Sequence, residues 1–206
     1  MLSYPKIPYT IRNDIEIIAF DKLDGSNIQA AWDWEAGFYE FGTRFRRFDA
    51  DDRFGETITL IQETYADPMR KIFLRNGVAK ATCFFEYFGA SSFAGNHKPS
   101  EEHKVILIDV CISNPYAGFV APEAFIKFFK DVPTPVVLYK GIATPEFLES
   151  VENGTLPGMT FEGVVCKGRE PGDKKTIVRF KWKNKAWVEA LKAKCNGDKK
   201  LFLELL

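Results

Sequence analysis

The sequence has few of the residues that serve most often in zinc sites and in nucleophilic catalysis. It contains two histidines and four widely spaced cysteines, with no Cys-x-x-Cys pair. His97 and His103 both fall near a polar segment typical of a surface loop. Zinc sites and Ser-His or Cys-His nucleophiles depend on well-placed imidazoles, so the composition disfavours both. Any catalysis would therefore rest on lysines, carboxylates and a hard metal ion.

Long apolar runs and an excess of charge are lacking as well. No apolar run reaches the roughly 18 residues of a membrane helix, and Met1–Pro8 contains no signal-peptide core. The sequence therefore predicts a cytoplasmic protein that does not contact membranes. Its 28 basic and 28 acidic side chains cancel, but residues 161–206 carry 12 basic and 6 acidic ones. This basic quarter suits a phosphate-bearing ligand, although a solvated surface is the usual explanation for such a run.

Hydrophobic residues make up 46% of the 206 residues and aromatic ones 15%, enough for one well-filled domain. Spacing and caps predict four helices, at Glu56–Tyr65, Pro122–Lys130, Pro145 to a stop at Gly154, and Lys185–Cys195. Short apolar or alternating runs predict eight strands, at Ile15–Phe20, Ile28–Trp32, Phe38–Phe41, Ala81–Phe88, Val105–Ile112, Pro135–Tyr139, Phe161–Lys167 and Thr176–Lys183. We therefore expect an α+β domain with mostly antiparallel sheets and peripheral helices.

A lysine stands at the turn after the first predicted strand. Lys22 lies between the strand end at Phe20 and the Asp24-Gly25 turn, which would hold its amine at the end of the strand. Taken alone, this is an ordinary turn with a solvated lysine, because such short motifs arise often by chance.

The last predicted strand carries a row of cations. Arg179, Lys181 and Lys183 alternate with apolar residues, so the two-residue period of a strand places all three on one face. A solvated strand edge is the simplest explanation of this row. Inside a cleft, however, the three cations would need an anion, and a polyphosphate would supply it.

Three carboxylates, Glu86, Asp109 and Glu162, occur in three different apolar strands. An ionised group among aromatic or aliphatic neighbours is costly to bury unless it is hydrogen-bonded or coordinated. Each of them alone could point to solvent. Together, and with Arg44 after another strand, they favour a cleft lined by acids and bases.

In chain order, these motifs resemble the covalent nucleotidyltransferase superfamily of ATP-dependent DNA ligases, RNA ligases and mRNA capping enzymes. The resemblance covers residues 20–184. The continuation Gly25-Ser26-Asn27 is most similar to the bacteriophage nick-sealing RNA ligases of the RNA ligase 2 type, whereas DNA ligases usually have arginine where Asn27 stands. The motifs that carry it are Lys22-x-Asp24-Gly25, Arg44, Glu86-Tyr-Phe-Gly, Asp109, Glu162-Gly-Val-Val and Lys181-x-Lys183.

The resemblance implies a catalytic role for four residues. Lys22 matches the nucleophile, whose amine attacks the α-phosphate of ATP to give lysyl-AMP and pyrophosphate. Glu162 matches the acid of the metal-assisted phosphate chemistry, and Lys181 and Lys183 match the pair that binds the α-phosphate and orients pyrophosphate. The metal, Mg²⁺ or Mn²⁺, would be held by Asp24 and Glu162. Because a free lysine is almost fully protonated at neutral pH, we expect nearby cations and burial to lower the pKa of Lys22.

The resemblance also implies a nucleotide-binding set. Within it, Glu86 would accept the ribose hydroxyl, and Asn27 and Arg44 would bind ribose and phosphates. Ile108 stands where the superfamily often has an aromatic residue that stacks on adenine, so base binding would rest on aliphatic contacts. The full set is Asp21, Leu23, Asn27, Arg44, Glu86, Ile108 and Val165.

Only 23 of the 206 residues follow Lys183, too few for the five-stranded oligonucleotide-binding barrel that follows in DNA ligases and capping enzymes. We therefore expect an adenylylation domain over residues 1–184, without that barrel. Residues 185–206 would form a short helical tail that packs on or near the core, and this tail is a candidate contact for a protein partner.

The leading hypothesis is an ATP-dependent RNA ligase that joins 5′-phosphate and 3′-hydroxyl ends through lysyl-AMP at Lys22. Its partner would be a nucleic acid with a 5′-phosphate end or nick, RNA in preference to DNA, in a host cytoplasm if the chain is phage-encoded. Arg44, Arg46, Arg47 and the basic stretch 167–200 are candidate phosphate contacts. A minimal DNA ligase, a GMP-transferring capping enzyme, a non-catalytic nucleotide- or end-binding module and a purely structural domain remain as alternatives.

Overall fold

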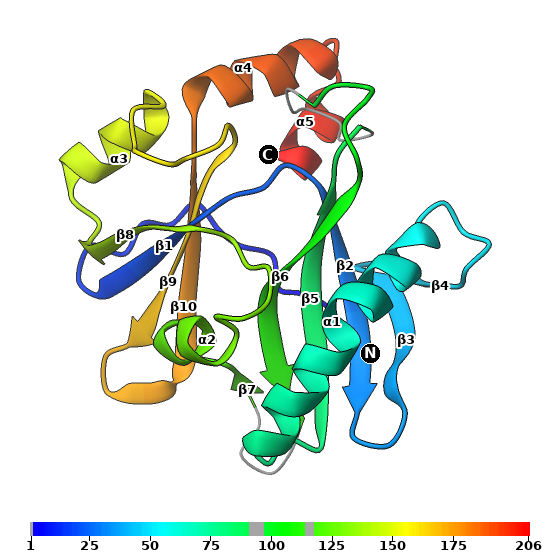
Figure 1. The fold of residues 1–206 in the computed structure, drawn as a ribbon. Coiled ribbons are helices and arrows are strands. Elements are labelled where there is room, and N and C mark those ends of the chain that lie inside the picture. The colour runs from blue at the N-terminus through cyan, green and yellow to red at the C-terminus, as the bar shows by residue number, and fades with distance from the viewer. Residues whose placement is uncertain (1, 91–96, 114–117) are drawn as a thin grey trace.

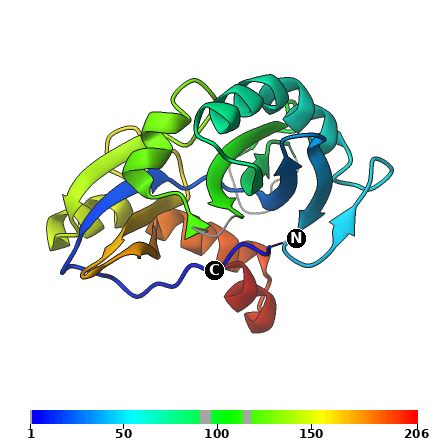
Figure 2. The ribbon, with the colours of Figure 1, turned by 90° about the horizontal axis from the view of Figure 1, so that it is seen from below.

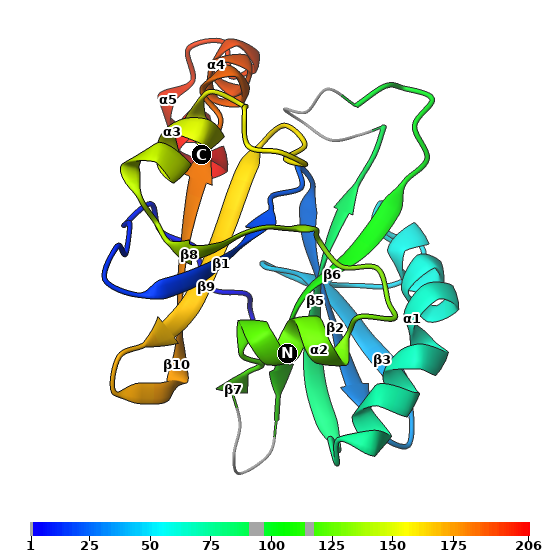
Figure 3. The same cartoon turned by 60° about the vertical axis from the view of Figure 1, so that its left-hand side comes forward.

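A computed structural model describes residues 2–90, 97–113 and 118–206, which form ten strands and five helices (Figure 1). The strands make two antiparallel sheets, with sheet A on the left and sheet B on the right in Figure 3. Sheet A has the order β10–β9–β1–β8, with bounds Asp173–Lys183, Gly163–Glu170, Glu16–Asp21 and Val137–Ile142. Sheet B has the order β4–β3–β2–β5–β6–β7, with bounds Arg47–Phe48, Gly37–Thr43, Ser26–Asp33, Lys80–Phe88, Lys104–Ile112 and Gly118–Phe119.

The helices lie around these two sheets. The long helix α1 (Glu56–Arg75) covers the outer face of sheet B, and α3 (Pro145–Glu152) covers the outer face of sheet A (Figure 1). Helix α2 (Pro122–Phe128) lies between the lower parts of the two sheets in Figure 3, whereas α4 (Lys185–Lys194) and α5 (Lys199–Leu205) follow β10 at the top of that view. The described residues include no helix long and apolar enough to cross a bilayer.

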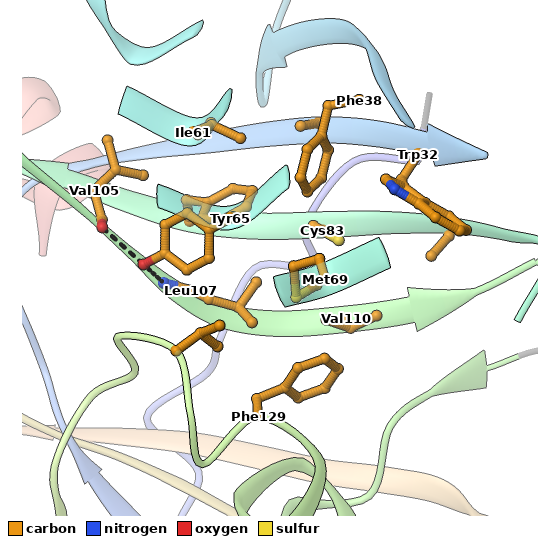
Figure 4. Close-up of a cluster of buried hydrophobic side chains, with 14 of the residues drawn as sticks. Trp32, Phe38, Ile61, Tyr65, Met69, Cys83, Val105, Leu107, Val110 and Phe129 are labelled. Carbon is orange, nitrogen blue, oxygen red and sulfur yellow. Dashed lines mark hydrogen bonds between the residues drawn. The ribbon is translucent and has the colours of Figure 1, made fainter. Parts of the chain in front are cut away.

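The largest hydrophobic cluster lies between sheet B and α1 (Figure 4). Tyr65 of α1 is fully buried there, and its hydroxyl donates a hydrogen bond of 2.9 Å to the Val105 carbonyl and accepts one of 3.2 Å from the Leu107 amide. The phenol therefore satisfies its polar atom while its ring fills the core. This cluster fixes the strands of sheet B that carry candidate site residues on their other face.

Helix α1 runs farther than the sequence predicts. It continues through Pro68 to Arg75, whereas the prediction ends at Tyr65. Its buried face has a spacing of four residues and includes Met69 and Phe73 beyond the proline. An internal proline costs about 3 kcal/mol, and burial of two large apolar side chains offsets a cost of that size.

Alternation along the strands gives sheet A two different faces. The outer face packs Ala19, Cys166 and Phe180 against α3. The inner face is turned toward sheet B, since Ile18 and Phe20 belong to the large core cluster. By the same alternation, β9 and β10 present their cations on this inner face: Lys167, Arg179, Lys181 and Lys183.

A buried ionic network, the Asp109 group, joins the two sheets. The group consists of Tyr4, Asp109, Lys167 and Arg179. Asp109 Oδ2 on sheet B lies 3.0 Å from Lys167 Nζ and 3.0 Å from Arg179 Nη2 on sheet A, and it accepts a hydrogen bond of 3.1 Å from the Tyr4 hydroxyl. The interpretation of Asp109 as an acid lining an open cleft is therefore wrong. Its carboxylate is 1% exposed and is satisfied by its partners.

The N-terminal segment crosses sheet A and reaches sheet B. The Pro8 carbonyl accepts a hydrogen bond of 2.9 Å from the amide of Lys181, so the segment runs beside β10 (Figure 2). Tyr4 packs on Phe84 and Phe119 of sheet B. The hydroxyl of Tyr9 donates a hydrogen bond of 2.9 Å to the Leu206 carbonyl, which holds the last residues of the chain against the first.

The predicted α+β class with antiparallel sheets is confirmed, with differences at the ends of elements. The strand expected at Pro135–Tyr139 forms instead at Val137–Ile142, because proline has no amide hydrogen for the ladder with β1. Part of the predicted tail is helix α5, which Asp198 caps by accepting hydrogen bonds from two amides. The two-residue strands β4 and β7 were not predicted, since they leave no periodic pattern.

Candidate active site

Lys22 lies in the loop that connects sheet A to sheet B. The loop Lys22–Gly25 runs from the end of β1 to the start of β2, and the amide of Lys22 donates a hydrogen bond of 2.9 Å to the Gly163 carbonyl. A Cβ on Gly25 would stand 2.3 Å from the carbonyl oxygen of Tyr87. Only glycine lets the loop approach β5 so closely. The Asp-Gly turn thus holds Lys22 where the two sheets meet.

The amine of Lys22 belongs to a compact cluster, the Glu162 group, formed by Lys22, Glu162 and Lys183. Both lysine Nζ atoms lie 2.8 Å from Oε1 of Glu162. Glu162 is 3% exposed, whereas Lys22 is 20% exposed and reaches solvent. The sequence-predicted residues Lys22, Glu162 and Lys183 therefore come together, although 161 positions separate Lys22 from Lys183 along the chain.

Local backbone geometry brings Glu162 beside Lys183. Gly163 pairs with Lys183 at the end of the β9–β10 ladder and has φ of 135°. A Cβ at Gly163 would lie 2.2 Å from the Trp182 carbonyl oxygen, so this conformation and this contact both require glycine. The Glu-Gly pair therefore places the carboxylate at the strand end where the cationic row of β10 terminates.

The pKa values of the three lysines move in different directions. Burial acts to lower the pKa of Lys22, but the carboxylates of Glu162 and Glu86 outweigh it, so that its pKa is raised. The expectation of a lowered pKa is therefore wrong for the site without a nucleotide. Burial lowers the pKa of Lys183 to about 7 and that of Lys181 to about 8, and the charge of Lys22 contributes to both shifts. Glu162 is the shared counter-charge of Lys22 and Lys183. Of these two lysines, Lys22 retains its proton and Lys183 loses its proton more readily.

Sheet B contributes a polar row opposite the Glu162 group. Asn27 on β2 pairs in register with Glu86 on β5. Burial raises the pKa of Glu86 to about 7, with Lys22 and Arg44 acting to lower it and Glu162 to raise it. Charges from both sheets therefore act on one carboxylate, which means that the two halves of the predicted site face the same space.

Three polar atoms in this space have no partner among the described residues. They are Asp24 Oδ2, Asn27 Oδ1 and Arg44 Nε, all buried. Buried polar atoms in native proteins are nearly always paired, so unpaired ones at a candidate site indicate a missing ligand. A carboxylate oxygen suits a hard cation such as Mg²⁺ or Mn²⁺, and a guanidinium nitrogen suits a phosphate. The residues present thus fit a metal–nucleotide ligand.

The remaining predicted residues lie in the connecting loop and on both sheets, and Ile108 lies beside the Asp109 group. The side chain of Asp21 accepts hydrogen bonds of 3.0 and 3.2 Å from the amide and hydroxyl of Thr160, and burial raises its pKa. Leu23 is half-buried in the connecting loop, and Val165 lies across from Lys181 on β9. Ile108 packs in the cluster of Tyr4 and Phe84, and its carbonyl accepts a hydrogen bond from a lysine of the Asp109 group.

Two aromatic residues near Lys183 and Lys181 were missed by the sequence reasoning. Trp187 on α4 lies under Lys183, with its ring centroid 3.6 Å from Nζ, and Tyr9 lies 4.8 Å from Lys181 Nζ. Each stabilises a cation through its ring face. Trp187 stands four residues after Lys183, in the first turn of α4, so the sequence does show that the two are near each other. Tyr9 is remote in sequence and gives no such signal.

No protein-family model and no curated protein matches the sequence. The fold is similar to solved structures of an RNA ligase from Naegleria gruberi. A lysine-to-methionine variant of that ligase with AMP and Mn has a TM-score of 0.63 at 14% identity, over 86% of this chain and 52% of the ligase. The same ligase with pyrophosphate has a TM-score of 0.62 at 17% identity, over 87% and 52%. The chain has an RNA-ligase fold. It spans about half the length of the ligase chains that it matches.

Proposed function

We propose that this protein is an ATP-dependent RNA ligase that joins a 5′-phosphate to a 3′-hydroxyl. The observation that carries the proposal is the convergence of Lys22 and Lys183 on one oxygen of Glu162. Two amines within hydrogen-bond distance of one carboxylate oxygen support the roles proposed here, with Lys22 as the nucleophile and Lys183 as a phosphate-binding cation. The adenylylation domain would comprise residues 1–184. Residues 185–206 would form a tail whose buried Trp187 and Leu191 pack beside the site.

In the first step, the deprotonated amine of Lys22 attacks the α-phosphorus of ATP. An N–P bond forms, the bond from that phosphorus to the β-phosphate oxygen breaks, and pyrophosphate leaves. The proton of Lys22 leaves along its hydrogen bond to Glu162. Nucleotide binding assists this loss, because bound cations and the cationic form of Lys181 disfavour a second positive charge nearby.

In the second step, an oxygen of the RNA 5′-phosphate attacks the same phosphorus and the N–P bond breaks, which frees Lys22 and leaves AMP on the 5′ end. The 3′-hydroxyl then loses its proton to water as its oxygen attacks the 5′-phosphate phosphorus. A P–O bond forms, the bond from that phosphorus to the AMP phosphate oxygen breaks, and AMP departs with the electrons of the broken bond. Catalysis of such transfers is mostly positioning and charge neutralisation. Arg44, Lys181 and Lys183 would supply the positive charge around the phosphates.

Asp24 and Glu162 are the residues that would hold Mg²⁺ or Mn²⁺. The unpaired Oδ2 of Asp24 supports this assignment. The metal would neutralise phosphate charge and would stabilise the pyrophosphate leaving group. On sheet B, Glu86 would accept the ribose hydroxyl and Asn27 would contact the ribose.

Incubation with α-labelled ATP and Mg²⁺ tests the first step. Wild-type protein should acquire an acid-labile AMP label, and Lys22→Ala should acquire none. Lys80→Ala, on the exposed far end of β5, serves as the matched lysine control and should label normally. Equal labelling of wild type and Lys22→Ala would overturn the assignment of the nucleophile. Binding of ATP without any label would instead favour a non-catalytic module.

The substrate is tested next with labelled protein. AMP-labelled protein should seal a nicked RNA duplex faster than a nicked DNA duplex. In a separate labelling reaction that starts from unlabelled protein, GTP should not replace ATP. Preference for DNA would point to a minimal DNA ligase, and labelling by GTP would point to a capping enzyme. Each outcome leaves the lysyl-nucleotide chemistry intact and changes only the substrate.

A further inference from the structure

The tight turn between β3 and β4 lies at the site end of sheet B. We call residues Arg44–Arg47 the Arg-Phe turn. Thr43, just before it, pairs with Ile28 on β2, which is one residue from Asn27. Arg44 is close enough to Glu86 and to Lys181 to affect the pKa values of both. The turn therefore begins inside the candidate site and extends outward.

Phe45 at the tip of this turn points into solvent. Its side chain is 90% exposed, more than any other large hydrophobic side chain in the described part of the chain. The turn is nevertheless well held. The Thr43 amide donates a hydrogen bond of 2.8 Å to the Arg46 carbonyl, and the Thr43 hydroxyl accepts one of 3.3 Å from the Phe45 amide. These hydrogen bonds fix the backbone at the tip of the turn.

Two arginines, Arg46 and Arg47, follow Phe45 in the chain. Arg46 Nη1 lies 2.6 Å from an oxygen of Asp52, and Arg47 pairs through Nε with Glu40. The two arginine side chains are still 50% and 70% exposed. A guanidinium has five N–H donors, so each arginine keeps donors for a phosphate while its acidic partner fixes its position.

A single exposed phenylalanine is ordinary on a protein surface, but its setting here is specific. The core of a protein interface is a contiguous, largely apolar patch, whereas Phe45 is the single exposed large apolar side chain within residues Arg44–Arg47 and stands between Arg44 and Arg46 in the chain. Aromatic rings set among cations are the usual means of binding single-stranded nucleic acid, since bases stack on the ring and phosphates pair with the cations. Charge complementarity therefore selects an RNA strand as the occupant.

We propose that the Arg-Phe turn binds the RNA strand beside its reacting end, with a base stacked on Phe45 and backbone phosphates on Arg46 and Arg47. The inference rests on the proposed function, because Arg44 connects the turn to the nucleotide site. It adds a recognition surface outside the Glu162 group. RNA with an unpaired base near its 5′-phosphate fits this surface better than a continuous duplex, whose bases are stacked on one another.

Fluorescence anisotropy with a labelled, 5′-phosphorylated single-stranded RNA measures the contribution of the ring. Phe45→Ala should weaken binding about tenfold, which corresponds to about 1.4 kcal/mol, and Phe45→Tyr should restore it. Tyr39→Ala removes an aromatic ring of β3 that is 52% exposed and lies outside the Arg-Phe turn. This variant should bind RNA as wild type does. Equal affinities for wild type and Phe45→Ala would overturn the proposal.

Salt dependence separates stacking from charge. Arg46→Ala and Arg47→Ala should each reduce the slope of log affinity against log salt by about one, whereas Phe45→Ala should lower the affinity and leave the slope as it is. RNA carrying 2-aminopurine at one of its first three nucleotides adds a direct signal. The wild-type protein should quench its fluorescence by stacking, and Phe45→Ala should not. Absence of quenching at all three positions would contradict the stack.

Lysyl-AMP formation without RNA distinguishes the two proposals. If wild type forms no lysyl-AMP but Phe45 still governs RNA affinity, the ligase function fails and the binding surface stands. If wild type forms lysyl-AMP and Phe45→Ala binds RNA as wild type does, the surface fails and the ligase function stands. Labelling of Phe45→Ala by ATP also reports that the variant has folded.

Discussion

Two buried carboxylates in this molecule each hold two cationic side chains, and the two arrangements do different work. In the Asp109 group, Lys167 and Arg179 of sheet A lie 3.0 Å from an oxygen of Asp109 on sheet B. All four members of that group are nearly excluded from solvent. In the Glu162 group, Lys22 is partly open to solvent, and unpaired polar atoms lie nearby. The closed group joins the sheets, and the open one has spare binding capacity.

The two groups also differ in whether their cationic side chains can lose a proton. Arg179 cannot lose its proton under physiological conditions, so the Asp109 group needs its carboxylate permanently. Burial lowers the pKa of Lys183 to about 7, so the Glu162 group can release a proton when its carboxylate is engaged elsewhere. A fixed charge suits a structural tie, and a group that can release a proton suits a site where charges arrive and leave.

Removal of the carboxylate from the closed group should have the largest effect. Asp109→Asn leaves Arg179, which cannot lose its proton, buried without its counter-charge, a change that typically costs about 3–5 kcal/mol. Urea unfolding should show this loss. Glu162→Gln should cost clearly less stability, because Lys183 can become neutral. If the two variants were equally destabilised, the contrast between a fixed and a releasable charge would be wrong.

In the open Glu162 group, removal of the carboxylate should change the protonation of Lys22. Glu162→Gln removes the carboxylate that contributes most to the raised pKa of Lys22, so the pKa of that amine should fall. Acylation by a small amine-reactive reagent across a pH series, read by mass spectrometry, reports the neutral fraction of Lys22 without ATP or metal. The acylation profile of Lys22 should move to lower pH in the variant.

Lys80 supplies the control in the same samples, since it is an exposed lysine at the far end of β5. Its acylation profile should be the same in wild type and Glu162→Gln. A Lys22 profile that stays in place would mean that Glu162 does not control the charge of the nucleophile, whatever its effect on ligation.

The sequence predicted the members of the open group well and misjudged the closed one. Lys22 and Glu162 stand in short motifs whose glycines, Gly25 and Gly163, fix the local backbone. Lys183 follows from the two-residue period of β10. Asp109 carries no local signal of its partners. Its ties to Tyr4 and Arg179 join segments that lie 105 and 70 residues away, so they emerge only from the tertiary structure.

Strand and helix positions followed from periodicity because alternation and caps are local. The errors occurred where packing outweighed local preference, as in α1 beyond Pro68, or where an element was only two residues long. The raised pKa of Lys22 was also beyond sequence reasoning, because it depends on the distances to Glu162 and Glu86 in the folded chain. The sequence indicated that cations lie near Lys22, but it did not show that Glu162 and Glu86 outweigh burial in setting the pKa of Lys22.

A third buried carboxylate, Glu86, should give the open side of the molecule a smaller effect, a dependence of nucleoside affinity on pH. Burial raises its pKa to about 7, so it changes from mostly protonated to mostly ionised between pH 6 and 8. An ionised carboxylate accepts a ribose hydroxyl hydrogen bond more strongly than a protonated one does. Affinity for adenosine should therefore rise with pH over this interval, by at most about tenfold, because the ionised fraction of a group with a pKa of about 7 rises about tenfold between pH 6 and pH 8.

Adenosine is the right probe for this effect because it has no phosphate that titrates near neutral pH. Calorimetric titration at pH 6, 7 and 8 should show the dissociation constant falling, and Glu86→Gln should give one value at all three. A pH-independent wild type would mean that Glu86 either stays ionised or does not meet the ribose. The open side of the molecule would then lack the titrating, ribose-binding carboxylate that distinguishes it from the closed Asp109 group.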